Sequence, residues 1–143
     1  GGRHVADHGR WTVVADPEGG EFCLFPAAEP TGLVVDARRP VEIARWWAEV
    51  LGWVVTIDED DEQEIRPTPD TVPGVMFVRT DGVKAGKNRL HLDLRPDDHD
   101  AELARVLALG ARRTDIDQGD APWAVLADPE GNEFCILGSP RPA

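Results

Sequence analysis

The sequence predicts an α+β protein built from two βαβββ modules, each of which places one helix on one face of a mixed sheet. Two observations support this prediction. A strand, a helix that ends at Leu-Gly and three further strands follow one another from residue 33. The same order of elements starts again at residue 90. The segment WTVVADPEGGEFCLF at residues 11–25 also returns as WAVLADPEGNEFCIL at residues 123–137, with ten of fifteen positions identical.

Each copy of this repeat is expected to form a β-hairpin. The shared DPEG sequence is strong turn chemistry, because Pro presets φ and Gly tolerates a positive φ. The offset of 112 residues is about one small domain. We therefore interpret residues 1–26 as the last three strands of one domain, 27–30 as a linker, 31–138 as a complete second domain and 139–143 as a tail.

The first module is predicted from the strand at 33–37 onward. Pro40 suits the first turn of a helix, apolar residues follow at helical spacing, and Gly52 ends the helix. The acidic residues 58–62 are expected at a solvated hairpin tip. The strands that complete the module are expected at 53–57, 63–66 and 75–79, with a loop at 81–87.

The second module repeats this order. Its helix is expected at 99–109, with Asp98 or Asp100 as the N-cap and Gly110 as the stop. Leu90, Leu92 and Leu94 alternate along the first strand and are expected to pack under the helices. The strands of this module are expected at 90–94, 112–115, 123–127 and 133–137.

Composition narrows the function classes. The net charge of −12 argues against binding to nucleic acid or to an anionic membrane, because both need Lys and Arg. No apolar run approaches the roughly 18 residues of a membrane span. Two cysteines are too few for a disulfide-built domain, so we expect both to be reduced and the protein to be cytoplasmic.

The ordered set RWWAEVLGW, KNRLHLDL, ALGARR and ADPEGNEFC resembles the vicinal oxygen chelate superfamily, in its glyoxalase-like branch beside bleomycin-resistance proteins and extradiol dioxygenases. The resemblance covers residues 31–138, and residues 10–26 as the end of a preceding, truncated glyoxalase-like domain. It implies that the strands curve into a cup with the helices outside, and that ligands or metals bind inside the cup.

The resemblance also implies four metal-binding places, on the first and fourth strands of each half. One place matches His91, and the one usually held by Glu falls on Cys135. Counting back from Gly52 gives Leu33 for the third place, and the fourth falls among residues 75–77. Two places therefore lack a ligand, and Mg²⁺ and Mn²⁺ sites prefer oxygen to a thiol. We expect no metal and no cofactor.

Strand alternation predicts which side chains line the cup. His91 and Asp93 share one face of their strand, and Glu133 and Cys135 share one face of the last strand. The predicted ligand-binding residues are His91, Asp93, Glu133, Cys135, Trp123 and Met76. Each also has a structural interpretation: His91 can hold strand register, Cys135 can be a small buried apolar residue, either carboxylate can pair with a neighbouring Lys or Arg, and Met76 can be packing.

Three functions follow from these expectations. The first is a metal-free module that binds a small organic molecule. The second is an enzyme, either a lyase or isomerase with His91 as general base and Asp93 orienting it, or a degenerate metalloenzyme. The third is a structural pairing module. For residues 11–25 we expect pairing with the main domain or with a second copy in a homodimer, because unpaired strand edges are avoided.

Overall fold

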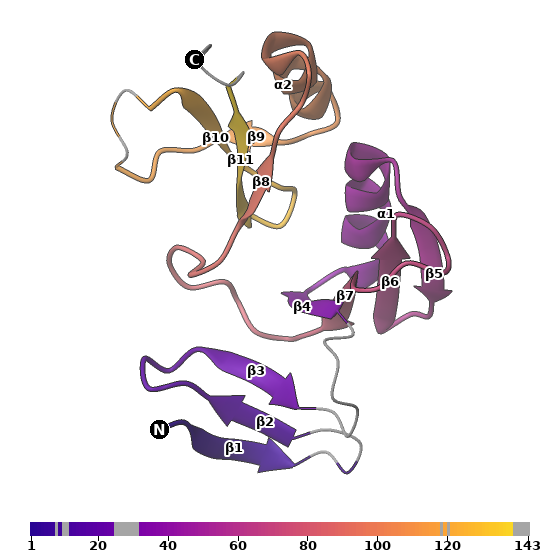
Figure 1. The fold of residues 1–143 in the computed structure, drawn as a ribbon, viewed down its shortest axis with the longest axis vertical. Helices are drawn as coiled ribbons and strands as arrows, with labels where there is room; N and C mark the ends of the chain where they lie inside the picture. The colour runs from indigo at the N-terminus through magenta and orange to yellow at the C-terminus, as the bar shows by residue number, and fades with distance from the viewer. Residues whose placement is uncertain (8, 10–11, 25–31, 118, 120, 139–143) are drawn as a thin grey trace. The chain divides into compact units, whose positions relative to one another are not determined.

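The computed structural model describes residues 1–143 apart from residues 8, 10–11, 25–31, 118, 120 and 139–143 (Figure 1). The predicted linker and tail lie outside the described residues, as do Trp11 and Phe25 at the ends of the first hairpin repeat. The chain divides into two compact units, residues 1–31 and 32–143. No helix in the described ranges is long and apolar enough to span a membrane, and the cellular compartment stays a prediction.

The first unit is a three-stranded antiparallel sheet in the order β1-β2-β3 (Figure 1). Its β2–β3 hairpin has the same register as the hairpin formed by residues 123–137: Ala15 pairs with Glu21 as Ala127 pairs with Glu133. The strands are β1 (Arg3–Asp7), β2 (Thr12–Ala15) and β3 (Glu21–Leu24).

The two DPEG turns are held by the same hydrogen bonds. The Asp16 carboxylate accepts from the N–H groups of Glu18 and Gly20, at 2.9 and 2.7 Å. The Asp128 carboxylate accepts from the N–H groups of Glu130 and Asn132, both at 2.9 Å. The sequence repeat is therefore a structural repeat, in which one carboxylate satisfies two turn amides.

The two hairpins differ in what covers them. Phe22 and Leu24 are half exposed, whereas Phe134 and Ile136, at the equivalent positions, are fully buried. That residues 1–26 belong to a glyoxalase-like module, and that they pair with another copy, stay predictions.

The second unit contains two βαβββ halves, each with a four-stranded mixed sheet. In both sheets the first strand pairs in parallel with the fourth, and the remaining pairs are antiparallel. The strand orders are β4-β7-β6-β5 and β8-β11-β10-β9 (Figure 1). This arrangement confirms the predicted α+β class with paired βαβββ modules.

The elements of these halves closely follow the sequence pattern. The first half comprises β4 (Gly32–Ala37), α1 (Pro40–Leu51), β5 (Val54–Asp58), β6 (Glu62–Arg66) and β7 (Gly74–Arg79). The second comprises β8 (Leu92–Leu94), α2 (His99–Ala108), β9 (Arg112–Arg113), β10 (Trp123–Ala127) and β11 (Glu133–Leu137).

The helix ends show the predicted chemistry. Pro40 opens α1, and Gly52 follows it with φ +66°, in the left-handed region that glycine adopts without strain. Of the two N-cap candidates for α2, Asp98 is the cap, because its carboxylate accepts the Ala101 N–H at 3.0 Å.

The first strand of the second half is shorter than predicted. Leu92 and Leu94 pack against the core, but Leu90 is 77% exposed, so the prediction that it packs under the helices is wrong. Pairing of β8 with β11 begins only at Leu92 opposite Phe134. Before β8, the Asn88 N–H donates to the Glu133 carboxylate. The Glu133 side chain, and not a backbone hydrogen-bond ladder, therefore holds this part of the chain.

One hydrophobic core joins the two halves. Phe134 of β11 contacts the rings of Trp46 and Trp47 of α1 edge-on, with ring centroids 5.8 and 5.1 Å apart. The indole N–H of Trp47 donates to the Asp128 carboxylate at 3.0 Å, and that of Trp46 donates to the Leu109 carbonyl at 2.8 Å. The helix of the first half therefore packs on the sheet of the second.

We expect Phe134→Ala to lower the free energy of unfolding of the main unit by about 3–5 kcal/mol, because it removes a fully buried ring between two tryptophans. The matched control is Phe22→Ala, which truncates the half-exposed ring at the equivalent position of the first unit and should cost no more than about 1 kcal/mol. Urea unfolding followed by tryptophan fluorescence measures both. Equal costs would contradict the assignment of this core.

Candidate functional site

Each sheet of the main unit has one face under the helices and one face turned away from them. Alternation along the strands assigns the second face to the residues between those of the core. We name these surfaces the first and second open faces. The first includes Val34, Asp36, Val54, Glu62, Glu64, Arg66 and Met76, and the second includes His91, Asp93, Trp123, Val125, Glu133 and Cys135.

Three predicted site residues come together on the second open face. Asp93 and Cys135 are register partners across the parallel β8–β11 pair. His91 Nε2 lies 3.1 Å from Asp93 Oδ1, and the ligand atoms of His91, Asp93 and Cys135 all lie within 4.8 Å of one another. His91 and Asp93 are partly exposed, whereas Cys135 is buried. A ligand would therefore approach the cluster from the side of the imidazole and the carboxylate.

The environment of Cys135 disfavours its thiolate. Burial raises the pKa of the thiol, and the charge of Asp93 and its hydrogen bond to the thiol raise it further. A reactive cysteine needs the opposite, a lowered pKa. Cys135 is therefore a neutral thiol beside a carboxylate and not an activated nucleophile.

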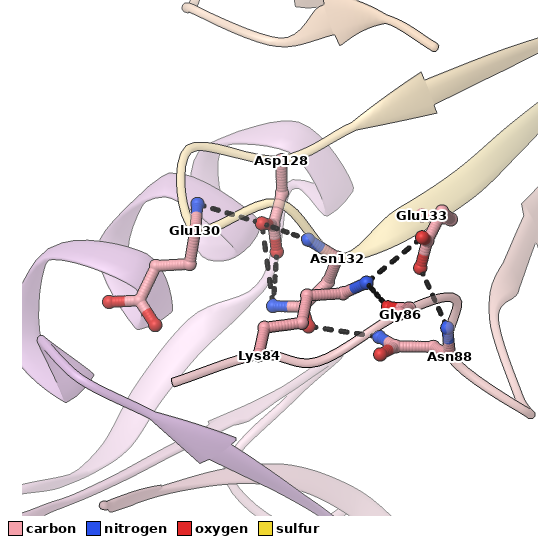
Figure 2. A network of polar contacts seen from close by, with 7 residues as sticks. All are labelled: Lys84, Gly86, Asn88, Asp128, Glu130, Asn132 and Glu133. Atoms are coloured by element: carbon pink, nitrogen blue, oxygen red, sulfur yellow. Dashed lines mark hydrogen bonds and ion pairs between the residues drawn. The ribbon is translucent and has the colours of Figure 1, made fainter. Parts of the chain in front are cut away.

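Glu133 lies on the same strand but belongs to a separate polar network (Figure 2). Its two carboxylate oxygens bind Lys84 Nζ at 2.9 Å and the Asn88 N–H at 3.1 Å. Burial works to raise the pKa of Glu133, but the hydrogen bonds from Lys84 and Asn88 outweigh it and lower the pKa. These contacts tie the loop before β8 to the start of β11, which is a structural role.

This network reaches the DPEG turn. The Asn88 side-chain amide donates to the Asn132 side-chain oxygen at 2.9 Å, and the Asn132 amide donates in turn to the Asp128 carboxylate at 3.1 Å (Figure 2). Asp128 thus links the loop at 84–88, its own turn and Trp47 of α1.

The two remaining predicted residues lie on different sheets. Trp123 is 37% exposed and lines, with Val125, a hollow of about 810 Å³ between β10 and the connection from β9. Val125 is also the register partner of Cys135 on the neighbouring strand. Met76 lies on the first open face, between Val34 and Glu64 in the register.

The two sheets can be compared strand by strand to find the four metal-binding places that the resemblance implies. The pair Asp93–Cys135 corresponds to Val34–Met76, and His91 corresponds to Gly32, one residue from the Leu33 given by counting. The equivalent places of the first half therefore hold no hard donor. Any ion would therefore be held by His91, Asp93 and Cys135 of the second half alone, whose ligand atoms lie within 4.8 Å of one another. These residues do not fit a divalent ion shared by both halves.

One polar group on the first open face has no counterpart among the predicted site residues. Glu64, which is only 3% exposed, forms a bidentate ion pair with Arg66. The signal in the sequence is the Glu-x-Arg spacing within a strand, which puts both side chains on one face. The acidic residues 58–62 directly precede this pair in the sequence, so Glu64 reads as a continuation of the acidic run.

The paired βαβββ fold is that of the vicinal oxygen chelate superfamily. The glyoxalase-like domain family matches residues 32–137, and the chain belongs to this family. No curated protein sequence matches the chain.

Solved structures share the fold at low identity. A glyoxalase/bleomycin resistance protein/dioxygenase family enzyme from Burkholderia phytofirmans PsJN is 20% identical, with a TM-score of 0.55, covering 76% of this chain and 97% of its own. The fosfomycin resistance protein FosX from Mesorhizobium loti is 14% identical, with a TM-score of 0.58 and coverages of 80% and 94%. A Streptomyces verticillus bleomycin-binding protein complexed with copper(II)-bleomycin is 16% identical, with a TM-score of 0.51 and coverages of 80% and 98%.

We expect Asp93→Asn to lower the pKa of Cys135, because the substitution removes the negative charge that opposes the thiolate. Ultraviolet thiolate absorbance as a function of pH measures the titration, in a Cys23→Ser background so that only Cys135 contributes. Thiolate should then form at lower pH than with Asp93 present. Asp100→Asn, which removes an equal but almost fully exposed charge, is the control. Identical titration curves would contradict the assigned Asp93–Cys135 contact.

Proposed function

We propose that the protein binds a small organic molecule against the second open face, without a divalent metal. The polar end of the ligand contacts His91, Asp93 and the Cys135 thiol, and its apolar body lies over Val125 and Trp123. Two observations support this proposal: the three-residue cluster, and a hollow lined by Val125, which is the register partner of Cys135.

The hollow has the size of a small-molecule pocket. Its volume of about 810 Å³ falls in the usual range of about 300–1,000 Å³. Its lining combines the apolar Trp123 and Val125 with polar residues, namely Arg113, Thr114, Asp115 and Asp117. The solved bleomycin-binding protein gives one instance of this fold holding a small molecule, although the fold alone does not specify a ligand.

A second candidate function is an enzyme, a lyase or isomerase, in which His91 is the general base. The 3.1 Å contact between His91 Nε2 and Asp93 favours it, because a carboxylate on one ring nitrogen orients the imidazole and leaves Nδ1 to accept a proton. His91→Gln would then abolish turnover of a substrate while leaving its binding in place.

We expect Val125→Arg to weaken binding of the neutral fluorophore N-phenyl-1-naphthylamine by about tenfold or more, because it places a charge in the apolar part of the site. Fluorescence titration measures the affinity, and circular dichroism checks the fold. Val83→Arg introduces the same charge at a 77% exposed position and should leave the affinity unchanged. Failure of the unsubstituted protein to bind the fluorophore, or equal affinity in both variants, would refute the proposed site.

Metal addition distinguishes the binding module from a metalloenzyme. We expect Mn²⁺ or Zn²⁺ added to chelator-treated protein to leave the thermal midpoint unchanged, since an ion that binds only the folded state would raise it. A midpoint raised by zinc, and no longer raised in His91→Ala, would establish a metal site at the cluster and replace the metal-free proposal.

A further inference from the structure

The first open face contains a guanidinium that is held in one orientation by a buried carboxylate. Arg66 Nε and Nη2 donate to the two oxygens of Glu64, at 2.8 and 2.9 Å. The Thr56 hydroxyl also donates to Glu64, at 2.6 Å. The Glu64 side chain is 4% exposed and that of Arg66 is 22% exposed, so the pair lies against the sheet.

The backbone beside this pair leaves room for it. A Cβ added at Gly74 would lie 3.0 Å from Glu64 Oε1 and 3.0 Å from Arg66 Cγ, closer than side chains normally approach. Gly74 therefore leaves room for the Glu64 carboxylate and the aliphatic part of the Arg66 side chain beside β7. The side chain at the equivalent place of the second half is Glu133.

The second half indicates that the fold does not need this ion pair. Strand alignment places Val125 where the first half has Glu64, and Ala127 where it has Arg66. The same βαβββ architecture thus forms with apolar side chains at both positions. A buried ion pair is on average no more stabilising than apolar residues of similar volume, so its presence in one half only points to a role other than folding.

The contacts with Glu64 use one edge of the guanidinium. Arg66 Nη1 makes none of the contacts with Glu64. The N–H groups of Nη1 and the second N–H of Nη2 lie at the end of the guanidinium, where they form a pair of donors that matches an oxyanion. The hydrogen bond to Glu64 raises the pKa of Arg66, which stays charged. Glu64 itself has both oxygens occupied.

Apolar side chains lie near Arg66 in the register, and the acidic Asp36 and Glu62 lie further along the same face. Val54 is the register partner of Arg66 and is 42% exposed, and Val34, beyond Met76 in the same sheet, is 41% exposed. We propose that the first open face binds an apolar molecule bearing one oxyanion group, a carboxylate or its equivalent, with Arg66 contacting the oxyanion and Val34, Val54 and Met76 contacting the apolar body. This site is on a different sheet from the His91 cluster and stands on its own contacts.

Two fluorophores that differ only in an oxyanion test the proposal. The sulfonate of 1-anilinonaphthalene-8-sulfonate stands in for the carboxylate, and N-phenyl-1-naphthylamine is the same molecule without it. The double variant Glu64→Gln/Arg66→Gln removes both charges, so the net charge of the protein is unchanged and no buried charge is left unpaired. We expect it to weaken binding of the sulfonate by about tenfold, the value of one charge-assisted contact, and to change binding of the neutral probe by less than about twofold.

Arg45→Gln is the matched control, because it removes a mostly exposed arginine from α1 and should leave both affinities unchanged. A test that needs no variant follows the Arg66 Nε–H signal of the native protein in a ¹H–¹⁵N spectrum. The signal should shift on addition of the sulfonate and stay in place with the neutral probe. Equal loss of both probes in the double variant, or no shift at saturating sulfonate, would overturn the proposal.

Discussion

The packing of Phe134 against Trp46 and Trp47 is the interaction on which the main unit depends. It joins the helix of the first half to the last strand of the second, so that two four-stranded sheets with separate hydrogen-bond ladders share one core. A sheet this small buries little apolar surface by itself. Without this contact each half would leave its helix-facing side only partly covered.

The Asp128 turn fixes the geometry of that contact. Its carboxylate accepts two amides of its own turn, the Trp47 indole and the Asn132 side chain, so one buried group sets the turn, the helix and the loop before β8. Asp16 makes the same turn contacts in the first unit, where the equivalent phenylalanine is half exposed. The local turn chemistry therefore does not require the core that surrounds it in the second hairpin.

The two open faces have diverged in chemistry while keeping one register. Asp93, Cys135 and Val125 lie in one row across the second sheet, and Val34, Met76 and Glu64 lie in the equivalent row of the first sheet. The acidic residue of this row is therefore on the first strand of the second half and on the third strand of the first half. Each face consequently has a different polar group: a histidine, carboxylate and thiol cluster on one, and a guanidinium held by a carboxylate on the other. A scaffold in which either sheet can hold the polar group can take different ligands without a change of fold.

The sequence by itself determined the features that depend on neighbouring residues. The two βαβββ modules, the hairpin at 123–137, the bounds of α1 and the Asp98 cap were predictable because periodicity, Pro, Gly and turn residues act within a few positions of the chain. The approach of His91, Asp93 and Cys135 was also predictable, since alternation and the resemblance place them on one face.

Only the tertiary structure decided which partners these residues take. Glu133 has the same alternation as Cys135, yet its charge is satisfied by Lys84, whose approach depends on how the loop at 81–87 crosses the sheet. Leu90 has the same spacing as Leu92, yet it is exposed because β8 begins after it. The Glu64–Arg66 pair has room because Gly74 of the neighbouring strand has no side chain, and which residue lies there depends on strand register. Tertiary packing determines the contacts between strands that are far apart in the sequence. No pattern of neighbouring residues predicts these contacts.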